Sequence, residues 1–483
     1  MLKIDQKWLN DVLEPLAPAD GSANVFFDMA VTGLGTDSRS LESGEVFVAL
    51  KGDRFDGHQY LEQAVASGAS ALVVQQNPGN LYTQSGSPVA VYVVNDTRAA
   101  LGELARQLLK QFSGKTVVVA GSNGKTTTKE FIASILRTRF QVISSPASFN
   151  NDIGVPLTVF SLLKQPCDIL VLEMGTNHPG ELAGLISIAQ PDAAVLTNIG
   201  PEHLEFFGNL DNVADEEWTV VTSLGPNGFA VLNADCPMSQ SRSRQLTCRY
   251  TSIGTQSDGH WLIDNIQLTH TTSSFQLTQN LPGQASVGEP GSRWNIPMPG
   301  HHNIANAAQA IILGKYFKVS NQDIQTGLDR VRKPSMRMEP VSAGGVTLIK
   351  DCYNANPASV QAALRTLGSM TASGRRMAVI GEMAEMGSAL EEFIPEIRQC
   401  AASNKIDFLV CVGGQLTKLV RMDGDSRMVI QSFESKSETL EWLKLNISCG
   451  DLVLFKGSRR ASMESVAEAL LDHLENSTME KVC

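Results

Sequence analysis

The sequence predicts an α/β fold of three domains: a small N-terminal α/β domain, a central domain built on a parallel sheet, and a C-terminal Rossmann-like domain. The chain has 483 residues, more than one hydrophobic core usually serves, since most domains contain roughly 100 to 200 residues. Short β-rich apolar runs alternate with helix-length segments, which is typical of parallel sheets covered by helices. Hydrophobic residues make up 42% and charged residues 18% of the chain, which indicates a globular protein rather than a disordered or fibrous one.

Residues 1–112 are predicted to form the first domain. Strand-like runs at Val46–Leu50, Ala71–Val74 and Val89–Val94 are separated by helical stretches and glycine-containing turns. A helix over Ala99–Phe112 then leads into the apolar strand Thr116–Ala120. We place the start of the second domain just before this strand.

Residues 113–333 are predicted to form the central domain. Three further β-rich runs, each followed by polar residues or glycine, continue a parallel sheet at Asp168–Glu173, Ala193–Asn198 and Phe229–Asn233. Between Cys236 and Trp294 the chain is rich in Ser, Thr and Gln and alternates in short β-like pieces. This segment predicts an antiparallel excursion at the edge of the sheet.

Residues 334–483 are predicted to form the third domain, because the βα rhythm resumes after Lys333 and Pro334. A second doubly wound sheet is the simplest interpretation. Its expected strands are Val346–Lys350, Met377–Ile380, Phe408–Val412 and Leu452–Phe455.

Charge and composition exclude several classes of function. A net charge of −11 argues against a nucleic-acid-binding or anionic-membrane surface, so an anionic substrate must meet local cations. The segment Met1–Leu13 has no continuous apolar core, and no apolar run approaches the roughly 20 residues of a membrane-spanning helix. We therefore expect a cytoplasmic protein without membrane insertion. The eight cysteines include no Cys-x-x-Cys pair, which predicts reduced thiols rather than a disulfide framework or a zinc site.

The clearest chemical signal is a buried strand that runs through a glycine turn into a helix, Val117–Thr127. Glycines let backbone N–H groups curl around phosphate oxygens, the helix N-terminus adds positive potential, and a lysine neutralises charge. The spacing departs from the longer Walker loop, because Val119 takes the place of its first glycine. The alternative is an ordinary strand-turn-helix corner, but the Gly-Lys-Thr-Thr string favours an ATP phosphate site. Its predicted residues are Gly121, Ser122, Asn123, Gly124, Lys125, Thr126 and Thr127.

Phosphoryl transfer also needs a metal that neutralises charge on the transferred group. Thr126 is expected to offer its hydroxyl to Mg²⁺, Glu173 closes a neighbouring strand, and His203 follows the next one. Alone, such a carboxylate or histidine is more often a cap or a surface group. Beside a phosphate loop at the carboxyl ends of parallel strands, the interpretation as Mg²⁺ ligands is favoured.

Together these motifs resemble the Mur ligase family, the cytoplasmic enzymes that extend the peptide of the bacterial cell-wall precursor. The resemblance spans nearly the whole chain. Besides the phosphate loop, it rests on segments 36–39, 55–58, 150–156, 173–181, 198–205, 302–306, 337–339, 351–357, 381–387 and 456–459.

The resemblance implies a monomeric, ATP- and Mg²⁺-dependent ligase that forms an amide bond through an acyl phosphate in peptidoglycan synthesis. Lys125, Glu173, His203 and Glu217 would be its catalytic residues. The first domain would bind the uridine diphosphate end of the substrate through Ser38, Arg39, Lys51 and His58. Further contacts to ATP would come from Asn303, Arg337 and Asp351, and to the other substrates from Asn151, Asn354, Asn356 and Lys456.

The string after Tyr353, Asn-Ala-Asn-Pro, favours one branch of this family. Its members join D-alanyl-D-alanine to UDP-N-acetylmuramoyl-tripeptide, and the DNPR-like string of the diaminopimelate- or lysine-adding relatives is absent. Two alternatives stay open: another ligase of the same type, which adds a different amino acid or builds folate polyglutamate, and a muramyl-peptide-binding scaffold with weakened catalysis.

Two positions depart from the family pattern. Glu217 stands where most members have a lysine that CO₂ carbamylates to bridge the metals, and Phe393 where relatives often have a histidine. A glutamate already carries a carboxylate, so it would supply a similar anionic oxygen without modification. The alternative is that Glu217 is a solvated acid in an acidic run and that the second metal site is weakened.

Overall fold

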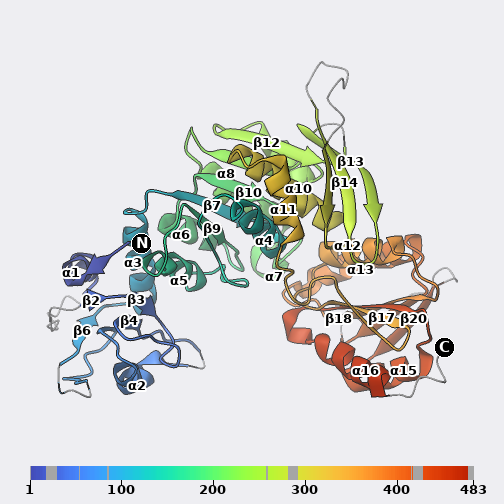
Figure 1. The fold of residues 1–483 in the computed structure, drawn as a ribbon. Coiled ribbons are helices and arrows are strands. Elements are labelled where there is room, and N and C mark those ends of the chain that lie inside the picture. Colours follow the sequence, from blue (N-terminus) through green and yellow to red (C-terminus); the bar gives the residue numbers. More distant parts are fainter. Residues whose placement is uncertain are drawn as a thin grey trace.

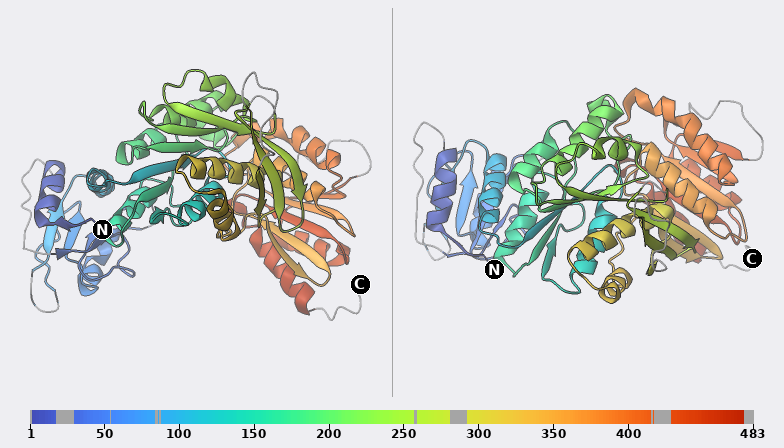
Figure 2. Two further views of the ribbon diagram at one scale, coloured as in Figure 1. Left: turned by 45° about the horizontal axis from the view of Figure 1, so that its top comes forward. Right: turned by 90° about the horizontal axis from the view of Figure 1, so that it is seen from above.

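The computed structural model describes residues 2–17, 30–53, 55–83, 86, 88–256, 259–280, 292–414, 416 and 428–476. The central domain lies between an N-terminal and a C-terminal domain in every view (Figures 1 and 2). Each of the three larger sheets falls within one of the predicted domain ranges. The predicted three-domain α/β fold is confirmed.

The N-terminal domain is built on a four-stranded parallel sheet of order β3-β4-β5-β6. These strands are Gly33–Gly35, Glu45–Val48, Ala71–Val74 and Ala90–Val93, and a small antiparallel pair joins β1 (Ile4–Asp5) to β2 (Ala30–Val31). Helices α1 (Gln6–Leu13), α2 (Leu61–Ala66) and α3 (Thr97–Leu109) accompany them, with short 3₁₀ turns at Glu14–Leu16 and Gly57–Tyr60.

Helix α3 begins two residues before the predicted start because Asp96 caps it. The Asp96 carboxylate accepts hydrogen bonds from the N–H groups of Arg98 (2.7 Å) and Ala99 (3.3 Å). Such a cap satisfies backbone donors that the first helical turn leaves free. The helix also ends at Leu109 rather than Phe112.

The central domain has a nine-stranded sheet of order β15-β14-β13-β12-β11-β10-β7-β9-β8. Its parallel part runs from β8 to β13, and β13, β14 and β15 pair antiparallel. The predicted edge excursion is therefore confirmed for β13 to β15, whereas β12 continues the parallel part. The strands are β7 (Lys115–Ala120), β8 (Val142–Ser144), β9 (Ile169–Glu173), β10 (Ala193–Leu196), β11 (Phe229–Asn233), β12 (Arg249–Gly254), β13 (Trp261–Leu268), β14 (Ser273–Gln279) and β15 (Ser292–Ile296).

Helices cover both faces of this sheet, and the alternation of side chains along β7 shows how. Val117 and Val119 pack into the core under α4, α10 and α11, while Val118 and Ala120 face the core on the opposite side. The helices are α4 (Lys125–Leu136), α5 (Gly154–Phe160), α6 (Glu181–Ile188), α7 (Leu204–Phe207), α8 (Leu210–Thr222), α9 (Pro237–Ser243), α10 (His301–Tyr316) and α11 (Asn321–Asp329), with a 3₁₀ turn at Ser161–Leu163.

Helix α4 packs very closely against helices α10 and α11. A Cβ built on Gly327 of α11 would lie 2.5 Å from the Cα of Ile135, and one on Gly314 of α10 would lie 2.8 Å from its Cγ2. The hydroxyl of Ser134 also donates to the carbonyl of Gly327 (2.6 Å). Only glycine permits this approach at position 327, since the obstructing atom belongs to the backbone.

The C-terminal domain has a six-stranded sheet of order β16-β17-β21-β18-β19-β20, parallel except for the antiparallel pair β16–β17. It is the predicted second doubly wound unit. Its strands are Glu339–Ala343, Val346–Asp351, Arg376–Gly381, Phe408–Val412, Val429–Phe433 and Leu452–Lys456 for β16 to β21. Its helices are α12 (Pro357–Ser369), α13 (Leu390–Ser403), α15 (Lys436–Asn446) and α16 (Glu464–Asn476), with 3₁₀ turns η4 (Gly387–Ala389) and η5 (Arg459–Ala461).

The structure bears on the expectations for membrane spans and for the cysteines. In the described ranges, no helix combines the length and apolar character needed to cross a bilayer. The expectation of reduced thiols is wrong at Cys449, which is disulfide-bonded. Free thiols are found at Cys167, Cys236, Cys248, Cys352, Cys400 and Cys411.

Candidate active site

The phosphate loop joins the end of β7 to the start of α4, and two left-handed glycines shape it. Gly121 has φ 117° and Gly124 has φ 85°. An added Cβ would lie 2.3 Å from the Thr197 hydroxyl at Gly121 and 2.4 Å from the Asn306 Oδ1 at Gly124. Both the backbone conformation and the space therefore require glycine at these two positions.

Lys125, the first residue of α4, turns its ammonium group back over this loop. Its Nζ donates to the carbonyl of Gly121 (2.6 Å) and lies 4.0 Å from the Oε2 of Glu202. Burial is the strongest influence and lowers the pKa of Lys125, but the carboxylates of Glu202, Glu217 and Glu173 together outweigh it and leave the pKa raised. The buried ammonium is thus kept charged, as a phosphate-binding group must be.

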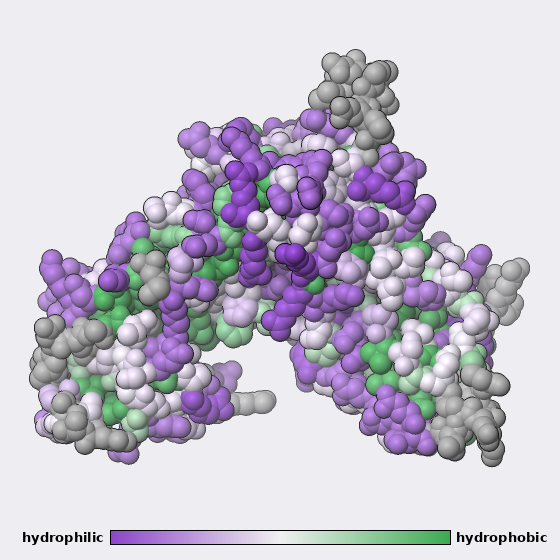
Figure 3. All heavy atoms as spheres, viewed as in Figure 1, coloured by the Kyte–Doolittle hydropathy of each residue, from purple (hydrophilic) through white to green (hydrophobic). Residues whose placement is uncertain are grey.

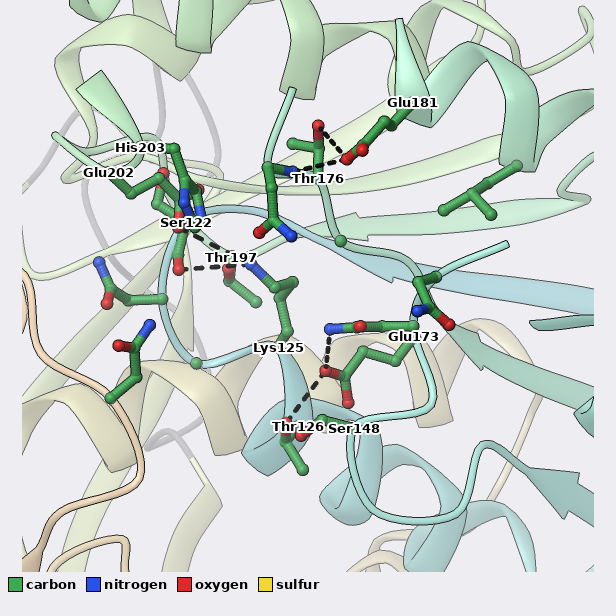
Figure 4. Close-up of a pocket in the computed structure, with 18 of the residues that line it drawn as sticks. Ser122, Lys125, Thr126, Ser148, Glu173, Thr176, Glu181, Thr197, Glu202 and His203 are labelled. Carbon is green, nitrogen blue, oxygen red and sulfur yellow. Dashed lines mark hydrogen bonds and ion pairs between the residues drawn. The ribbon is translucent and has the colours of Figure 1, made fainter. Parts of the chain in front are cut away.

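Glu173 and Thr126 form an oxygen-rich corner beside the loop (Figure 4). The Thr126 hydroxyl and the Asn150 amide each donate to Oε1 of Glu173, both at 3.1 Å. Within the described part of the chain, Oε2 of Glu173 is buried and accepts no hydrogen bond, while it lies 3.6 Å from the ammonium of Lys129.

This corner fits Mg²⁺. The ion prefers oxygen ligands and is usually held by one or two protein groups together with substrate phosphates and water. A hydroxyl beside a carboxylate with an unbonded buried oxygen supplies that partial set. Among the described residues no three His, Cys, Asp or Glu side chains gather as a complete metal site, so nucleotide phosphates would have to complete the coordination.

His203 belongs to a second polar group. Its Nε2 lies 3.8 Å from Oε2 of Glu202, and its Nδ1 is ion-paired with Glu385 of the C-terminal domain. The close contact with His203 holds the pKa of Glu385 below its usual range. Figure 4 shows His203 and Glu202 together, with Lys125 between them and the Thr126–Glu173 corner. The three predicted metal ligands are thus divided between two places rather than joined in one.

Glu217 lies on α8 with no exposed surface, so the interpretation as a solvated acid is wrong. Neither of its carboxylate oxygens has a hydrogen-bond partner in the described ranges. Its pKa is raised to about 8, chiefly by burial; the charge of Lys125 lowers it and the charge of Glu202 adds to the rise. Glu202 and Glu217 therefore form a buried acidic pair behind Lys125.

A cleft of about 1030 Å³ opens in front of the loop. Its walls come from α3 of the N-terminal domain, from the central domain, and from α12 and neighbouring loops of the C-terminal domain. Figure 3 shows the surface hollowed between the two outer domains. The predicted residues that line the cleft are Ser122, Asn123, Gly124, Lys125, Thr126, Thr127, Asn151, Glu173, His203, Asn303, Arg337, Asp351, Asn354, Asn356 and Lys456.

Two side chains of the C-terminal domain touch the phosphate loop directly. The amide of Asn356 donates to Oδ1 of Asn123 (3.0 Å), and the guanidinium of Arg337 donates to the hydroxyl of Thr126 (3.2 Å). Arg337 also stacks over the ring of Tyr353, 4.4 Å from its centre. These contacts join residues that lie more than 200 positions apart in the sequence.

Comparison with known proteins identifies this architecture. Residues 30–108 match the Mur ligase family catalytic domain, residues 119–314 the Mur ligase middle domain, and residues 336–459 the Mur ligase glutamate ligase domain. The UDP-N-acetylmuramoyl-tripeptide–D-alanyl-D-alanine ligase of Escherichia coli is 35% identical over 454 residues, which cover 92% of this chain and 95% of that enzyme. The chain belongs to the Mur ligase family.

Solved structures of Mur ligases agree with this assignment. The MurF of Acinetobacter baumannii superimposes with a TM-score of 0.83 at 28% identity, covering 98% of this chain and 100% of that one. The MurF ligase of Thermotoga maritima, solved in complex with ADP, has a TM-score of 0.77 at 27% identity and covers 92% and 98% of the two chains.

The N-terminal residues that the Mur ligase resemblance singled out lie elsewhere. The described lining of the cleft does not include Ser38, Arg39, Lys51 or His58. His58 bonds through both ring nitrogens, to the Asp56 carboxylate (2.7 Å) and from the N–H of Gln75 (3.0 Å). It therefore fixes a loop to the end of β5. The side chain of Arg39 is 81% exposed and pairs with Asp37 (2.7 Å), and Ser38 donates to Gln63 (3.0 Å).

In the C-terminal part of this Mur ligase, two predicted ligand-binding residues bind each other. The ammonium of Lys456 is almost fully buried and donates to Oδ2 of Asp351 (2.8 Å) and to the carbonyl of Asn354 (3.0 Å). The side chain of Asn303 also has a partner within the protein, because its amide donates to the carbonyl of Pro299 (2.7 Å). These contacts shape the cleft wall from within.

Sequence reasoning missed three residues of the site. Lys129 is fully buried one turn after Lys125, where it donates to the carbonyl of Ser145 (2.7 Å) and faces Glu173. Glu202 stands directly before the predicted His203, and Glu385 lies within segment 381–387. Of the three, Lys129 could have been recognised from the sequence, because a lysine four residues after another in a helix lies on the same face.

Proposed function

We propose that the chain is a cytoplasmic ATP-dependent ligase that joins D-alanyl-D-alanine to UDP-N-acetylmuramoyl-tripeptide. The products are UDP-muramyl-pentapeptide for peptidoglycan synthesis, ADP and phosphate. One observation carries the chemistry: the charged Lys125 and the Thr126–Glu173 corner face a cleft walled by all three domains. The substrates are inferred from extensive similarity to enzymes of that name.

The reaction needs activation because a carboxylate is a poor electrophile. Transfer of the γ-phosphoryl group of ATP to the terminal carboxylate of the tripeptide gives an acyl phosphate, and ADP leaves. The free amine of D-alanyl-D-alanine then attacks the acyl carbon, the tetrahedral intermediate expels phosphate, and the amine loses a proton. Charge builds on phosphoryl oxygens in the first step and on the carbonyl oxygen in the second.

Different residues of the site bind the phosphates, hold the metal and exclude water. Lys125 and the N–H groups of the glycine turn bind and orient the phosphates. Thr126 and Glu173 would hold Mg²⁺ at their corner and His203 would hold it at the second polar group, and the bound metal would neutralise charge on the phosphoryl group. Arg337 brings a further cation from the C-terminal domain. That domain also covers the cleft and keeps water from the acyl phosphate.

Glu217 supplies a buried carboxyl group behind Lys125 in this proposal, and this group becomes an anion when a bound cation displaces its proton. Its buried carboxylate stands where most relatives need a carbamylated lysine, so the ligase works without that modification. The unbonded oxygens and their nearness to the charges of Lys125 and Glu202 support this role.

We further propose that the domains bind separate parts of the substrates. Residues 1–112 bind the uridine diphosphate end, with Ser38, Arg39 and Lys51 in contact and His58 as a loop anchor. Residues 113–333 bind ATP through the phosphate loop and Asn303, and Asn151 contacts the peptide. Residues 334–483 bind the dipeptide, with Asn354 and Asn356 beside it and the pair formed by Asp351 and Lys456 in support.

The deciding experiment measures phosphate release with each substrate omitted in turn. We expect turnover to require ATP, UDP-N-acetylmuramoyl-tripeptide and D-alanyl-D-alanine together, and mass spectrometry to find the pentapeptide. A panel of single amino acids in place of the dipeptide tests the other ligase activities. Tight binding of the tripeptide without phosphate release would instead establish a scaffold.

A further inference from the structure

Two residues with an unusual backbone meet where the central and C-terminal domains touch. His203 has φ 50° and Glu385 has φ 64°. The left-handed region costs a non-glycine residue about 1–2 kcal/mol, and such residues persist where the surroundings fix them. Backbone strain of this kind is most common at functional sites. A strained pair of residues at a domain boundary therefore indicates a functional role.

The two strained residues hold each other through side chain and backbone. The Glu385 carboxylate is ion-paired with Nδ1 of His203, and the carbonyl of Glu385 accepts the N–H of Glu205 (3.1 Å). The His203 side chain is only 11% exposed. Glu385 therefore fixes both the ring of His203 and the first turn of α7, which follows it.

The other ring nitrogen is left to face the site. Nε2 of His203 lies 3.8 Å from Oε2 of Glu202, and both residues line the cleft (Figure 4). A histidine that binds a metal through one nitrogen commonly donates its other N–H to a carboxylate, which fixes the tautomer and the orientation of the ring. The carboxylate of Glu385, ion-paired with Nδ1 of His203, stands in the position of that carboxylate.

We propose that Glu385 is a positioning residue that aims Nε2 of His203 at the Mg²⁺ of the cleft. This inference rests on the proposed function. Because Glu385 belongs to the C-terminal domain and His203 to the central domain, the ring is held in place only while the two domains are docked. Docking of the third domain thus completes a metal ligand of the second.

The test replaces the carboxylate in two ways. Glu385→Gln keeps the size of the side chain, and Glu385→Gly keeps the left-handed backbone, since glycine adopts it freely. Glu391→Gln is the matched control, because Glu391 is an exposed acid on α13 of the same domain. Thermal melting of each variant establishes that it is folded.

Two quantities are measured on the full chain. Electron paramagnetic resonance follows Mn²⁺ binding in the presence of a non-hydrolysable ATP analogue, and steady-state kinetics give kcat and the KM for ATP. We expect both Glu385 variants to bind Mn²⁺ at least about 10-fold more weakly and to lose about 10-fold in kcat. The KM for the dipeptide should stay within about 2-fold of the parent value.

The outcomes separate the two proposals. Parent-like Mn²⁺ affinity in folded Glu385→Gln and Glu385→Gly overturns the positioning role, whatever the turnover. The same holds if Glu391→Gln weakens Mn²⁺ binding equally. If the parent chain makes no product, the proposed function fails, while the Mn²⁺ titration still decides whether Glu385 orients His203.

Discussion

Lys125 shows how a single side chain can be buried and charged at once. Its ammonium is enclosed by backbone carbonyls and lies near three carboxylates, of which Glu202 is 4.0 Å away. An isolated buried ammonium would lose its proton, but the surrounding negative charge makes that unfavourable. A permanent cation is thus available where phosphate oxygens arrive.

Replacing Lys125 by methionine should abolish ligation while leaving a folded protein. We expect kcat to fall at least about 100-fold, as for loss of a preorganised group at a developing charge, and ADP affinity to drop by calorimetry. Lys115→Met is the control, because Lys115 is an exposed lysine at the opposite end of β7, paired with Asp192. Unchanged nucleotide affinity and product formation in Lys125→Met would remove the basis of the ATP site.

Glu217 makes stability depend on pH. Its pKa is raised to about 8 in the folded chain from an ordinary 4.5, so between these values the unfolded chain has lost a proton that the folded chain keeps. Stability from this group therefore falls as pH rises through that window, by at most roughly 1.4 kcal/mol per pH unit. Denaturant unfolding of Glu217→Gln from pH 5 to 8 should give a shallower decline than the parent.

The same variant should be a poor enzyme. Replacing this carboxyl group by an amide, which cannot become an anion, is expected to lower kcat about 10-fold or more, with the fold intact. If the unfolding free energy of Glu217→Gln and of the parent fell equally with pH, the Glu217 carboxyl would not be buried as described. If the variant turned over like the parent, the charge of Glu217 would not be needed for catalysis.

The sequence predicted some of these residues because their positions follow from local pattern. A glycine turn after a buried strand fixes where Lys125 and Thr126 must lie, and Glu173 ends the neighbouring strand. The helical spacing placed Lys129 on the face of Lys125, but the contacts of Lys129, Glu202 and Glu385 could not be found that way. Their partners come from other elements, so only the folded chain shows that they meet.

At the scale of elements, strands with a continuous apolar run were predicted to within about two residues, as for β5, β11 and β19. The strands β3, β8, β16 and β20 were not, because they are short or polar. Edge strands of this kind are set by their neighbours rather than by their own hydrophobicity.

Helix α12 combines a capping box with a contact to the phosphate loop. Asn356 caps the helix through Ser359 and also reaches Asn123. Asn356→Ala should lose about 1 kcal/mol of unfolding free energy and also weaken turnover. Ser435→Ala removes the equivalent cap of α15 and should lose stability alone. Asn356→Ser should keep the cap and lose only turnover; equal turnover in all three would contradict a role at the loop.

The contact between α11 and α4 gives a sharp test of packing. Alanine at position 327 would press its Cβ against the backbone at Ile135, so we expect Gly327→Ala to lower the unfolding free energy by about 1–3 kcal/mol. Gly184→Ala, on α6 with open space around it, should instead raise it by up to about 1 kcal/mol. A higher unfolding free energy in both variants would contradict the close packing of α11 against α4.

For the whole molecule, the order of the domains was predictable because each has its own run of strands. Their docking was not, since it rests on side chains such as Arg337 and Asn356 that meet the loop from a distant part of the chain. Which surfaces touch is decided by tertiary complementarity, and no local pattern encodes it.

Closure of the C-terminal domain is expected to accompany catalysis, with residues 333–335 as the hinge. Adding an ATP analogue and UDP-N-acetylmuramoyl-tripeptide should reduce the radius of gyration in small-angle scattering, because the acyl phosphate must be kept from water. Lys125→Met should show no such compaction under the same conditions. An unchanged scattering profile for the parent would count against closure.

The contacts from Arg337 and Asn356 have one more consequence. Thr126 and Asn123, which a triphosphate would engage, already have partners supplied by the third domain. When a nucleotide binds, its phosphates must therefore replace the hydrogen bonds that Arg337 and Asn356 already make to the loop. The heat of binding is smaller than a count of new contacts suggests, and selectivity arises from how well each nucleotide replaces the partners it displaces.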